Sequence, residues 1–222
     1  LLASLLYPQS KVNINNLVEY GDKMYKPLSD KLYSGIVYDS YTGTDEKKLE
    51  GFYRNGLMNG EWTWWNVFGG IDSTGNFRKG LFYGQWKFYH SNGQLKAKGN
   101  YRNGNGTDLG STGIPRHGRY GRWTFWYENG QKKAESTYKD GKSVGLFTRW
   151  HENGQKREEV KIKDGKLNGL GTKWYENGKK RGQATFKDGE QDGIETWWYE
   201  NGNKKRVENY KDGKGDGLWT KW

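Results

Sequence analysis

The chain has 222 residues and a formal net charge of +11, and only 32% of its residues are hydrophobic. Low hydrophobicity suits a disordered chain, but the 16% aromatic content argues against disorder, because disordered segments are poor in aromatics. The absence of cysteine excludes disulfides, thiolate metal sites and thiol catalysis. No run of roughly 18 apolar residues, the length that spans a membrane, occurs in the sequence.

Residues 1–34 are predicted to form an N-terminal lead-in segment that includes the first strands. The first seven residues read Leu-Leu-Ala-Ser-Leu-Leu-Tyr. They fit either the end of the apolar region of a signal peptide or a short helix packed on the first strands. The first alternative favours an exported or cell-surface protein over a cytoplasmic one.

Residues 35–222 are predicted to be an array of repeats, because four sequence columns recur at one constant spacing. The columns are Asn-Gly at Asn129, Asn153, Asn177 and Asn201; Asp-Gly at Asp140, Asp164, Asp188 and Asp212; glycine at Gly121, Gly145, Gly169, Gly193 and Gly217; and tryptophan at Trp126, Trp150, Trp174, Trp198 and Trp222.

The period continues upstream, where Gly60 and Gly84 are separated by the same interval. The interval from Gly84 to Gly121 is longer than one repeat, and the excess falls at residues 105–117. We therefore expect an inserted loop there. The sequence ends at Trp222, early in the next repeat, which indicates either an array that continues further or a closing strand.

Each repeat is predicted to be a β-hairpin. Aromatic and β-branched residues flank the Asn-Gly pair, which tolerates the two positive φ angles of a two-residue type I′ turn. The Asp-Gly segment then reverses the chain into the next hairpin. The predicted fold is all-β: an elongated, single-layer, twisted antiparallel sheet of tandem 24-residue β-hairpin repeats.

A two-residue turn would pair each column tryptophan with a cation on the return strand, because residues equidistant from the turn face each other. Such pairs contribute roughly 0.5–1 kcal/mol each when exposed. The column is either a stabilising ladder or a docking strip for a partner, and both roles are compatible. The predicted pairs are Trp126 with Lys133, Trp150 with Arg157, Trp174 with Arg181, and Trp198 with Lys205.

The repeat unit, with its Trp-Tyr-Glu-Asn-Gly start and its Tyr-Lys-Asp-Gly-Lys end, resembles the MORN-repeat variant of bacterial proteins, including the YwqK-type antitoxin family. The match is strongest over residues 126–217. The resemblance implies hairpin sheets that act as interaction or assembly modules. The antitoxin family implies a protein that binds and neutralises a partner toxin.

The sequence offers no catalytic or metal-binding set. Its three histidines have no metal-ligand spacing, and His90 and His151 occupy places in a tyrosine column. The carboxylates Glu128, Glu152, Glu176 and Glu200 recur in each repeat, which is unlike a single acid–base catalyst. We therefore expect no enzyme, no cofactor, no metal and no small-molecule substrate.

A protein-interaction or assembly scaffold is the favoured function, with another protein or further copies of the chain as partner. Extended repeat surfaces bind along their length, and unpaired sheet edges invite pairing. The alternative is binding of an anionic lipid surface, nucleic acid or a glycan through the Trp and Lys/Arg column. For the anionic partners this predicts affinity that falls steeply with salt.

Overall fold

The computed structural model describes residues 10–109, 112–217 and 219–222. The prediction for the first seven residues lies outside this part of the chain. Among the described residues there is no α-helix, and strands follow one another as antiparallel hairpins, so the all-β hairpin fold is confirmed. Strand pairing assigns 18 strands to one open sheet, and β2 and β3 form a separate two-stranded sheet.

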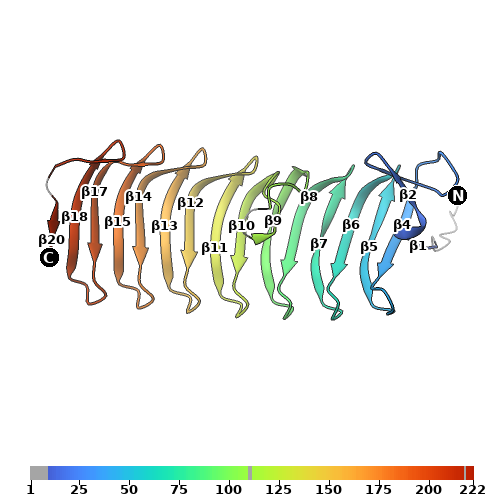
Figure 1. The fold of residues 1–222 in the computed structure, drawn as a ribbon, viewed down its shortest axis with the longest axis horizontal. Coiled ribbons are helices and arrows are strands. Elements are labelled where there is room, and N and C mark those ends of the chain that lie inside the picture. The colour runs from blue at the N-terminus through green and yellow to red at the C-terminus, as the bar shows by residue number, and fades with distance from the viewer. Residues whose placement is uncertain (1–9, 110–111, 218) are drawn as a thin grey trace, which may run out of the picture. The chain divides into compact units, whose positions relative to one another are not determined.

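Figure 1 shows the hairpins that follow one another along the chain. The chain divides into two compact units. The first comprises residues up to Gln94 and Asn100–Gly118, and the second comprises Leu95–Gly99 and Arg119–Trp222. Strand β1 pairs in parallel with β4, whereas the hairpin strands pair antiparallel. The elements that begin in the first unit are β1 (Val12–Asn13), the 3-10 helix η1 (Ile14–Asn16), β2 (Val18–Tyr20), β3 (Lys23–Tyr25), β4 (Gly35–Ser40), β5 (Lys47–Arg54), β6 (Leu57–Trp65), β7 (Ile71–Arg78) and β8 (Leu81–Tyr89).

Strand β9 (Leu95–Gly104) has its first five residues in the second unit and the others in the first. The remaining strands are β10 (Arg119–Trp126), β11 (Lys132–Lys139), β12 (Lys142–Trp150), β13 (Lys156–Lys163), β14 (Lys166–Trp174), β15 (Lys180–Lys187), β16 (Glu190–Gln191), β17 (Gly193–Trp198), β18 (Lys204–Lys211), β19 (Lys214–Gly215) and β20 (Thr220–Lys221).

The two turns of each repeat differ from each other. At Asp140-Gly141 both residues have positive φ, 49° and 78°, and Lys139 pairs with Lys142, as in a two-residue type I′ turn. At the Asn-Gly turn only the glycine, Gly130, has positive φ. The amide of Tyr127 donates to the carbonyl of Gln131, which leaves three residues in the loop. The predicted two-residue Asn-Gly turn is therefore wrong, and a three-residue loop closes this end.

The asparagine of the three-residue loop has a role of its own. The Asn129 side chain accepts a hydrogen bond from the amide of Gln131 at 2.9 Å. The amide of Gly130 donates to the Tyr127 carbonyl at 3.0 Å. These two hydrogen bonds close the turn without a positive φ at Asn129. Gly130 is therefore the one residue of this turn in the left-handed conformation.

The core of the first unit is a row of tryptophans lying on glycines of the neighbouring strand. A Cβ atom added at Gly51 or Gly75 would overlap the indole of Trp62 or Trp86, respectively. Both tryptophans are 1% exposed. Their Nε1 atoms donate to the carbonyls of Phe52 and Asn76 at 3.1 and 3.0 Å. A single sheet thus buries large rings because the residue beneath each ring has no side chain.

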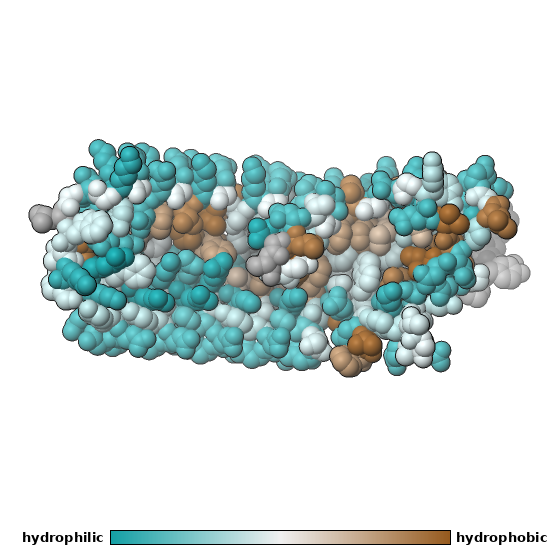
Figure 2. All heavy atoms as spheres, viewed as in Figure 1, coloured by the Kyte–Doolittle hydropathy of each residue, from teal (hydrophilic) through white to brown (hydrophobic). Residues whose placement is uncertain are grey.

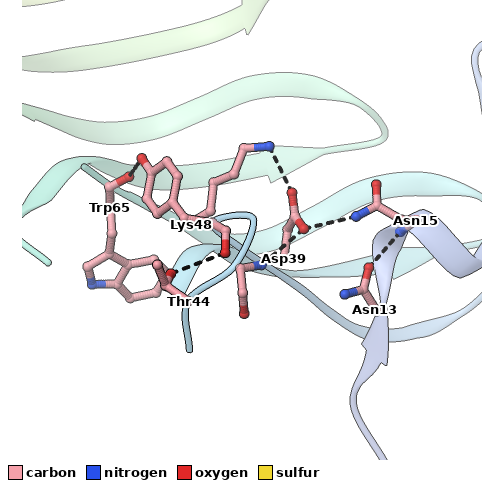
Figure 3. A network of polar contacts seen from close by, with 8 residues as sticks. Asn13, Asn15, Asp39, Thr44, Lys48 and Trp65 are labelled. Carbon is pink, nitrogen blue, oxygen red and sulfur yellow. Dashed lines mark hydrogen bonds and ion pairs between the residues drawn. The ribbon is translucent and has the colours of Figure 1, made fainter. Parts of the chain in front are cut away.

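The lead-in segment is tied to β4 by a buried carboxylate, Asp39, shown in Figure 3. Its oxygens accept hydrogen bonds from Asn15 and Lys48, both at 2.9 Å. The amide of Ser40 donates to the same side chain. The Lys48 ammonium holds the pKa of Asp39 below its usual range, by hydrogen bonding and by charge attraction that outweigh the effect of burial.

The segment that carries the extra residues returns to the sheet through a few polar contacts. The Tyr101 hydroxyl donates to the Pro115 carbonyl at 2.6 Å, and Ile114 is 2% exposed. The amide of Asn105 donates to Nδ1 of His117 at 3.2 Å. Described residues 105–109 and 112–117 contain no strand, and the amide of Arg116 donates to the carbonyl of Asp108 within the segment.

Candidate interaction surfaces

The second unit presents two sheet faces of different character. We call the face that carries Trp150, Trp174 and Trp198 the ladder face. The face that carries Trp123 and Phe147 is the core face. Side chains alternate between the two faces along each strand.

On the ladder face, each lysine stands over the tryptophan of the next repeat. Lys132 Nζ lies 5.5 Å from the centre of the Trp150 ring and also donates to Glu135 at 3.3 Å. The same contact recurs along the unit: Lys156 over Trp174 at 5.8 Å, Lys180 over Trp198 at 5.8 Å, and Lys204 over Trp222 at 5.9 Å. The ladder therefore joins successive hairpins.

The sequence predicted the tryptophans of this ladder but the wrong cations. Trp126 pairs with Lys132 and not with Lys133, because the three-residue loop shifts the register by one next to the turn. Trp150, Trp174 and Trp198 likewise pair with Lys156, Lys180 and Lys204. Three of the predicted cations instead lie over tyrosines: Lys133 over Tyr127, Arg181 over Tyr175, and Lys205 over Tyr199. For the fourth, Arg157, no cation–π contact with Trp150 is found among the described residues, and Trp150 pairs with Lys156 instead.

A second set of contacts joins one hairpin to the next near the Asn-Gly loops. The Tyr127 hydroxyl donates to the Trp150 carbonyl at 2.8 Å, and the Tyr175 hydroxyl donates to the Trp198 carbonyl at 2.7 Å. Nε2 of His151 bonds the Trp174 carbonyl at 3.0 Å. His151 therefore substitutes for a tyrosine, as predicted.

The ladder face also carries an exposed aliphatic row. Leu146, Leu170 and Ile194 lie at equivalent positions of successive repeats and are 51%, 55% and 61% exposed. They face Lys161, Thr185 and Asn209 on the neighbouring strands, which cover little of them. Beside this row lie the buried threonines Thr148 and Thr172. Three aligned apolar side chains in water are thus available to a partner.

On the core face of the second unit, the residue type at one equivalent position differs from repeat to repeat. Trp123 is fully buried, and a Cβ atom at Gly99 would overlap its ring. Arg119 lies 4.5 Å from its ring centre, and Arg149 lies 4.9 Å from that of Phe147. The equivalent positions of successive repeats are Trp123, Phe147, Gly171, Glu195 and Trp219.

At Gly171 the row has no ring, and a hollow of about 130 Å³ lies there. Val160 and Ala184, on the two neighbouring strands, pair with Gly171. The side chains that line the hollow include Phe186, Trp197 and Glu195. Figure 2 shows hydrophobic residues gathered over this part of the second unit. The Nε1 atom of Trp197 is buried and has no hydrogen-bond partner among the described residues.

Next to the hollow, a buried polar cluster replaces the aromatic core. Arg206 donates to Glu195 at 3.2 Å and to Glu208 at 3.0 Å. Both carboxylates are less than 10% exposed. The Tyr210 hydroxyl donates to Glu208 at 3.1 Å, and burial together with the Glu208 carboxylate raises the pKa of Tyr210. The cluster is satisfied internally, which favours a structural role.

A basic groove adjoins this cluster and has a volume of about 590 Å³. Trp197 lines both the groove and the hollow. Arg206 already bonds two carboxylates. Within the described ranges, Arg181, Lys205 and Lys221, which also line the groove, have no carboxylate at ion-pair distance. The groove is therefore suited to an anionic group.

The described residues include no group of three histidines or carboxylates that could hold a metal ion. They also include no helix of a length and apolarity that would cross a membrane.

Neither the exposure of the aliphatic row nor the hollow was predicted from the sequence. The signal for the hollow was present, because aligning successive repeats places Gly171 where Trp123 and Phe147 stand. No comparable sign in the sequence indicated that Nε1 of Trp197 would lack a hydrogen-bond partner, because this depends on the side chains that surround it in the fold.

Comparison with known families gives a match to the MORN repeat variant, at residues 82–103, 119–140, 143–164, 167–188 and 191–212. Such repeats are generally associated with binding to proteins or membranes. Comparison with the curated proteins finds no match, so no homologue supports the resemblance to YwqK-type antitoxins.

Proposed function

We propose that this chain, a MORN-repeat protein with five tandem copies of the variant repeat, is a non-enzymatic scaffold that binds another protein along its ladder face. The observation that carries the proposal is the exposed row of Leu146, Leu170 and Ile194. Single exposed apolar residues are normal on soluble proteins, but an aligned row is a feature of interaction surfaces.

The spacing of the row suits an extended partner. Consecutive members are two strands apart, which corresponds to roughly 9.6 Å. A partner strand or helix laid across the repeats would meet the row at regular intervals, as repeat proteins bind along their length. Fully burying an exposed side chain of this size contributes about 1.5–3 kcal/mol before the costs of association, and these half-exposed side chains contribute correspondingly less.

The ladder residues border this row and are proposed to frame it. Trp126, Trp150, Trp174 and Trp198 hold the repeats in register, and the paired lysines place cations along the edge of the surface. Lys133, Arg157, Arg181 and Lys205, which the sequence assigned to the same strip, are not used in this proposal. The partner is either a different protein, of which a toxin to be neutralised is one version, or a second copy of this chain.

The test combines capture from an extract of the source organism with sedimentation of the purified chain. The wild type should retain a stoichiometric partner or self-associate. A triple variant, Leu146→Ser, Leu170→Ser and Ile194→Ser, should lose this binding and keep its β-sheet circular dichroism. A matched control, Glu152→Ser, Glu176→Ser and Glu200→Ser, changes exposed residues of the Asn-Gly loops outside the row and should bind normally. Neither partner nor self-association in the wild type would refute the proposal.

A second candidate function is binding to an anionic lipid surface or nucleic acid. It is favoured by lysines on both sides of several Asp-Gly turns, as at Lys139 and Lys142 or Lys163 and Lys166, and by the net charge of +11. Binding to vesicles with anionic lipid, or to duplex DNA, should then weaken steeply as salt rises. Binding that is unchanged between low and high salt would exclude this candidate.

A further inference from the structure

The hollow at Gly171 is a gap in a row that the chain fills elsewhere with its own side chains. Trp123 and Phe147 occupy the two preceding equivalents on the core face. Val160 and Ala184, which pair with Gly171 on the neighbouring strands, are too small to fill the space that an aromatic ring occupies in the preceding repeats. Phe186 approaches from one side, since a Cβ atom at Gly171 would stand 3.0 Å from it. An open space remains, lined by apolar side chains such as Leu167 and Phe186 and also by polar ones that include Gln183 and Gln191.

The wall of the hollow carries a hydrogen-bond donor that lacks an acceptor. The indole nitrogens of Trp62 and Trp86 donate to backbone carbonyls, whereas the buried Nε1 of Trp197 finds no partner among the described residues. Leaving a buried polar group unpaired costs free energy, because the group has lost its hydrogen bonds to water. A ligand that brings an acceptor oxygen to this nitrogen would recover that cost, so Trp197 favours an occupied hollow.

Basic side chains next to the hollow favour a ligand that carries negative charge. The basic groove shares Trp197 with the hollow, and its Arg181, Lys205 and Lys221 have no carboxylate partner within the described ranges. Arg181 lies three residues from Ala184 along β15, which corresponds to roughly 10 Å. In an extended peptide that distance separates a residue from the third residue after it. Arg181 is the extra residue of a β-bulge opposite Lys173 and Trp174, which interrupts the alternation of side chains between the two faces.

From these observations we infer that the core face of the second unit binds an extended peptide segment of a partner protein. The segment places an aromatic side chain in the hollow at Gly171 and an acidic residue, three or four positions further along, in the basic groove. A peptide oxygen beside the aromatic residue accepts from Nε1 of Trp197. The hollow lies on the opposite face from the aliphatic row, so this site goes beyond the function proposed above.

The probe is the capped peptide acetyl-Trp-Gly-Ser-Glu-Glu-amide, with one version that replaces the tryptophan by alanine and another that replaces both glutamates by lysine. Binding is followed on the full chain by the indole N–H resonance of Trp197 in ¹⁵N-labelled protein and by the anisotropy of labelled peptide. The parent peptide should bind saturably and shift that resonance. Both altered peptides should bind at least tenfold more weakly.

The variants test each part of the site. Gly171→Phe places in the hollow the residue that Phe147 provides in the preceding repeat, and it should weaken binding at least tenfold. Trp197→Phe removes the donor without filling the hollow and should weaken binding severalfold, which keeps the test decisive if Gly171→Phe does not fold. Arg181→Ala should weaken binding severalfold, whereas Arg157→Ala, the equivalent change one repeat earlier, should not.

Two results would overturn the inference. One is a parent peptide that leaves the Trp197 resonance unmoved at millimolar concentration. The other is equal binding by the wild type and by both Gly171→Phe and Trp197→Phe. The triple variant of Leu146, Leu170 and Ile194 should bind the peptide normally. Loss of partner capture in that variant with retained peptide binding therefore distinguishes the two proposals, and either can fail alone.

Discussion

The indole of Trp86 lies flat on the backbone of Gly75, in the space that a side chain at residue 75 would take. The ring is held there by the hydrogen bond from its Nε1 to the Asn76 carbonyl at 3.0 Å. Phe77 packs its edge on the same indole, with ring centres 5.2 Å apart. This arrangement explains how a sheet with few aliphatic residues buries apolar area.

Replacing Gly75 by alanine should destabilise the protein strongly. The added methyl group would overlap the Trp86 ring, and overpacking of this kind costs about 1–3 kcal/mol. Urea unfolding followed by circular dichroism measures the effect. The matched control is Gly171→Ala, where the new Cβ would stand 3.0 Å from Phe186 and 3.2 Å from Val160. A smaller loss in the control is expected, and equal losses would contradict the ring-on-glycine account.

The Asn-Gly loops should depend on the left-handed conformation of their glycine. Gly202 has φ of 98° and open space around it, so Gly202→Ala adds strain and no clash. We expect a loss of roughly 1–2 kcal/mol in the free energy of unfolding. Glu200→Ala, in the same loop but without positive φ, should change it little. A neutral Gly202→Ala variant would mean that the loop closes in another way.

The turns show what sequence reasoning predicted and what it could not. The constant spacing of the columns was sufficient to predict hairpins, because Asn-Gly and Asp-Gly both mark reversals. The loop length was wrong at Asn129-Gly130, where a pair compatible with a type I′ turn instead forms the end of a three-residue loop. The two residues Asn-Gly determine which φ angles the turn can adopt. They do not determine the length of the loop, which depends on how the flanking strands pair.

The corrected cation pairs predict a specific energetic coupling. Lys132 lies over Trp150 at 5.5 Å, so a double-mutant cycle of Lys132→Ala and Trp150→Ala should give a coupling of about 0.5–1 kcal/mol. The cycle of Arg157→Ala and Trp150→Ala should give a value close to zero. Chemical unfolding of the four proteins in each cycle measures this. A larger coupling for Arg157 would restore the register predicted from a two-residue turn.

The buried carboxylate of the lead-in predicts a pH dependence. Lys48 lowers the pKa of Asp39 in the folded protein, so its ionised form stabilises the fold above the usual carboxyl pKa. That contribution is lost as pH falls through the lowered pKa. The stability difference between wild type and Asp39→Asn should therefore be largest above about pH 5 and shrink below about pH 4.

Urea midpoints across this pH range test the expectation, with the exposed Asp45→Asn as control. A difference between wild type and Asp39→Asn that grows on acidification would contradict the assigned role of Lys48.

The candidate surfaces were less predictable than the fold. The column tryptophans were found because they recur, and the aliphatic positions recur as well. Recurrence does not reveal that Leu170 stays 55% exposed while Thr172, two positions on, is buried. The register shift beside Leu170 and the partner side chains decide exposure. The hollow at Gly171 arises where the pattern is broken, so a search for repeating columns passes over it.

Hydrogen exchange on the chain alone and in complex with its captured partner tests the proposed scaffold most directly. We expect backbone amides of β12, β14 and β17 around Leu146, Leu170 and Ile194 to exchange more slowly in the complex. The triple serine variant should capture no partner and show no such slowing. Unchanged exchange along these three strands, with slowing confined to other parts of the chain, would contradict binding through the ladder face.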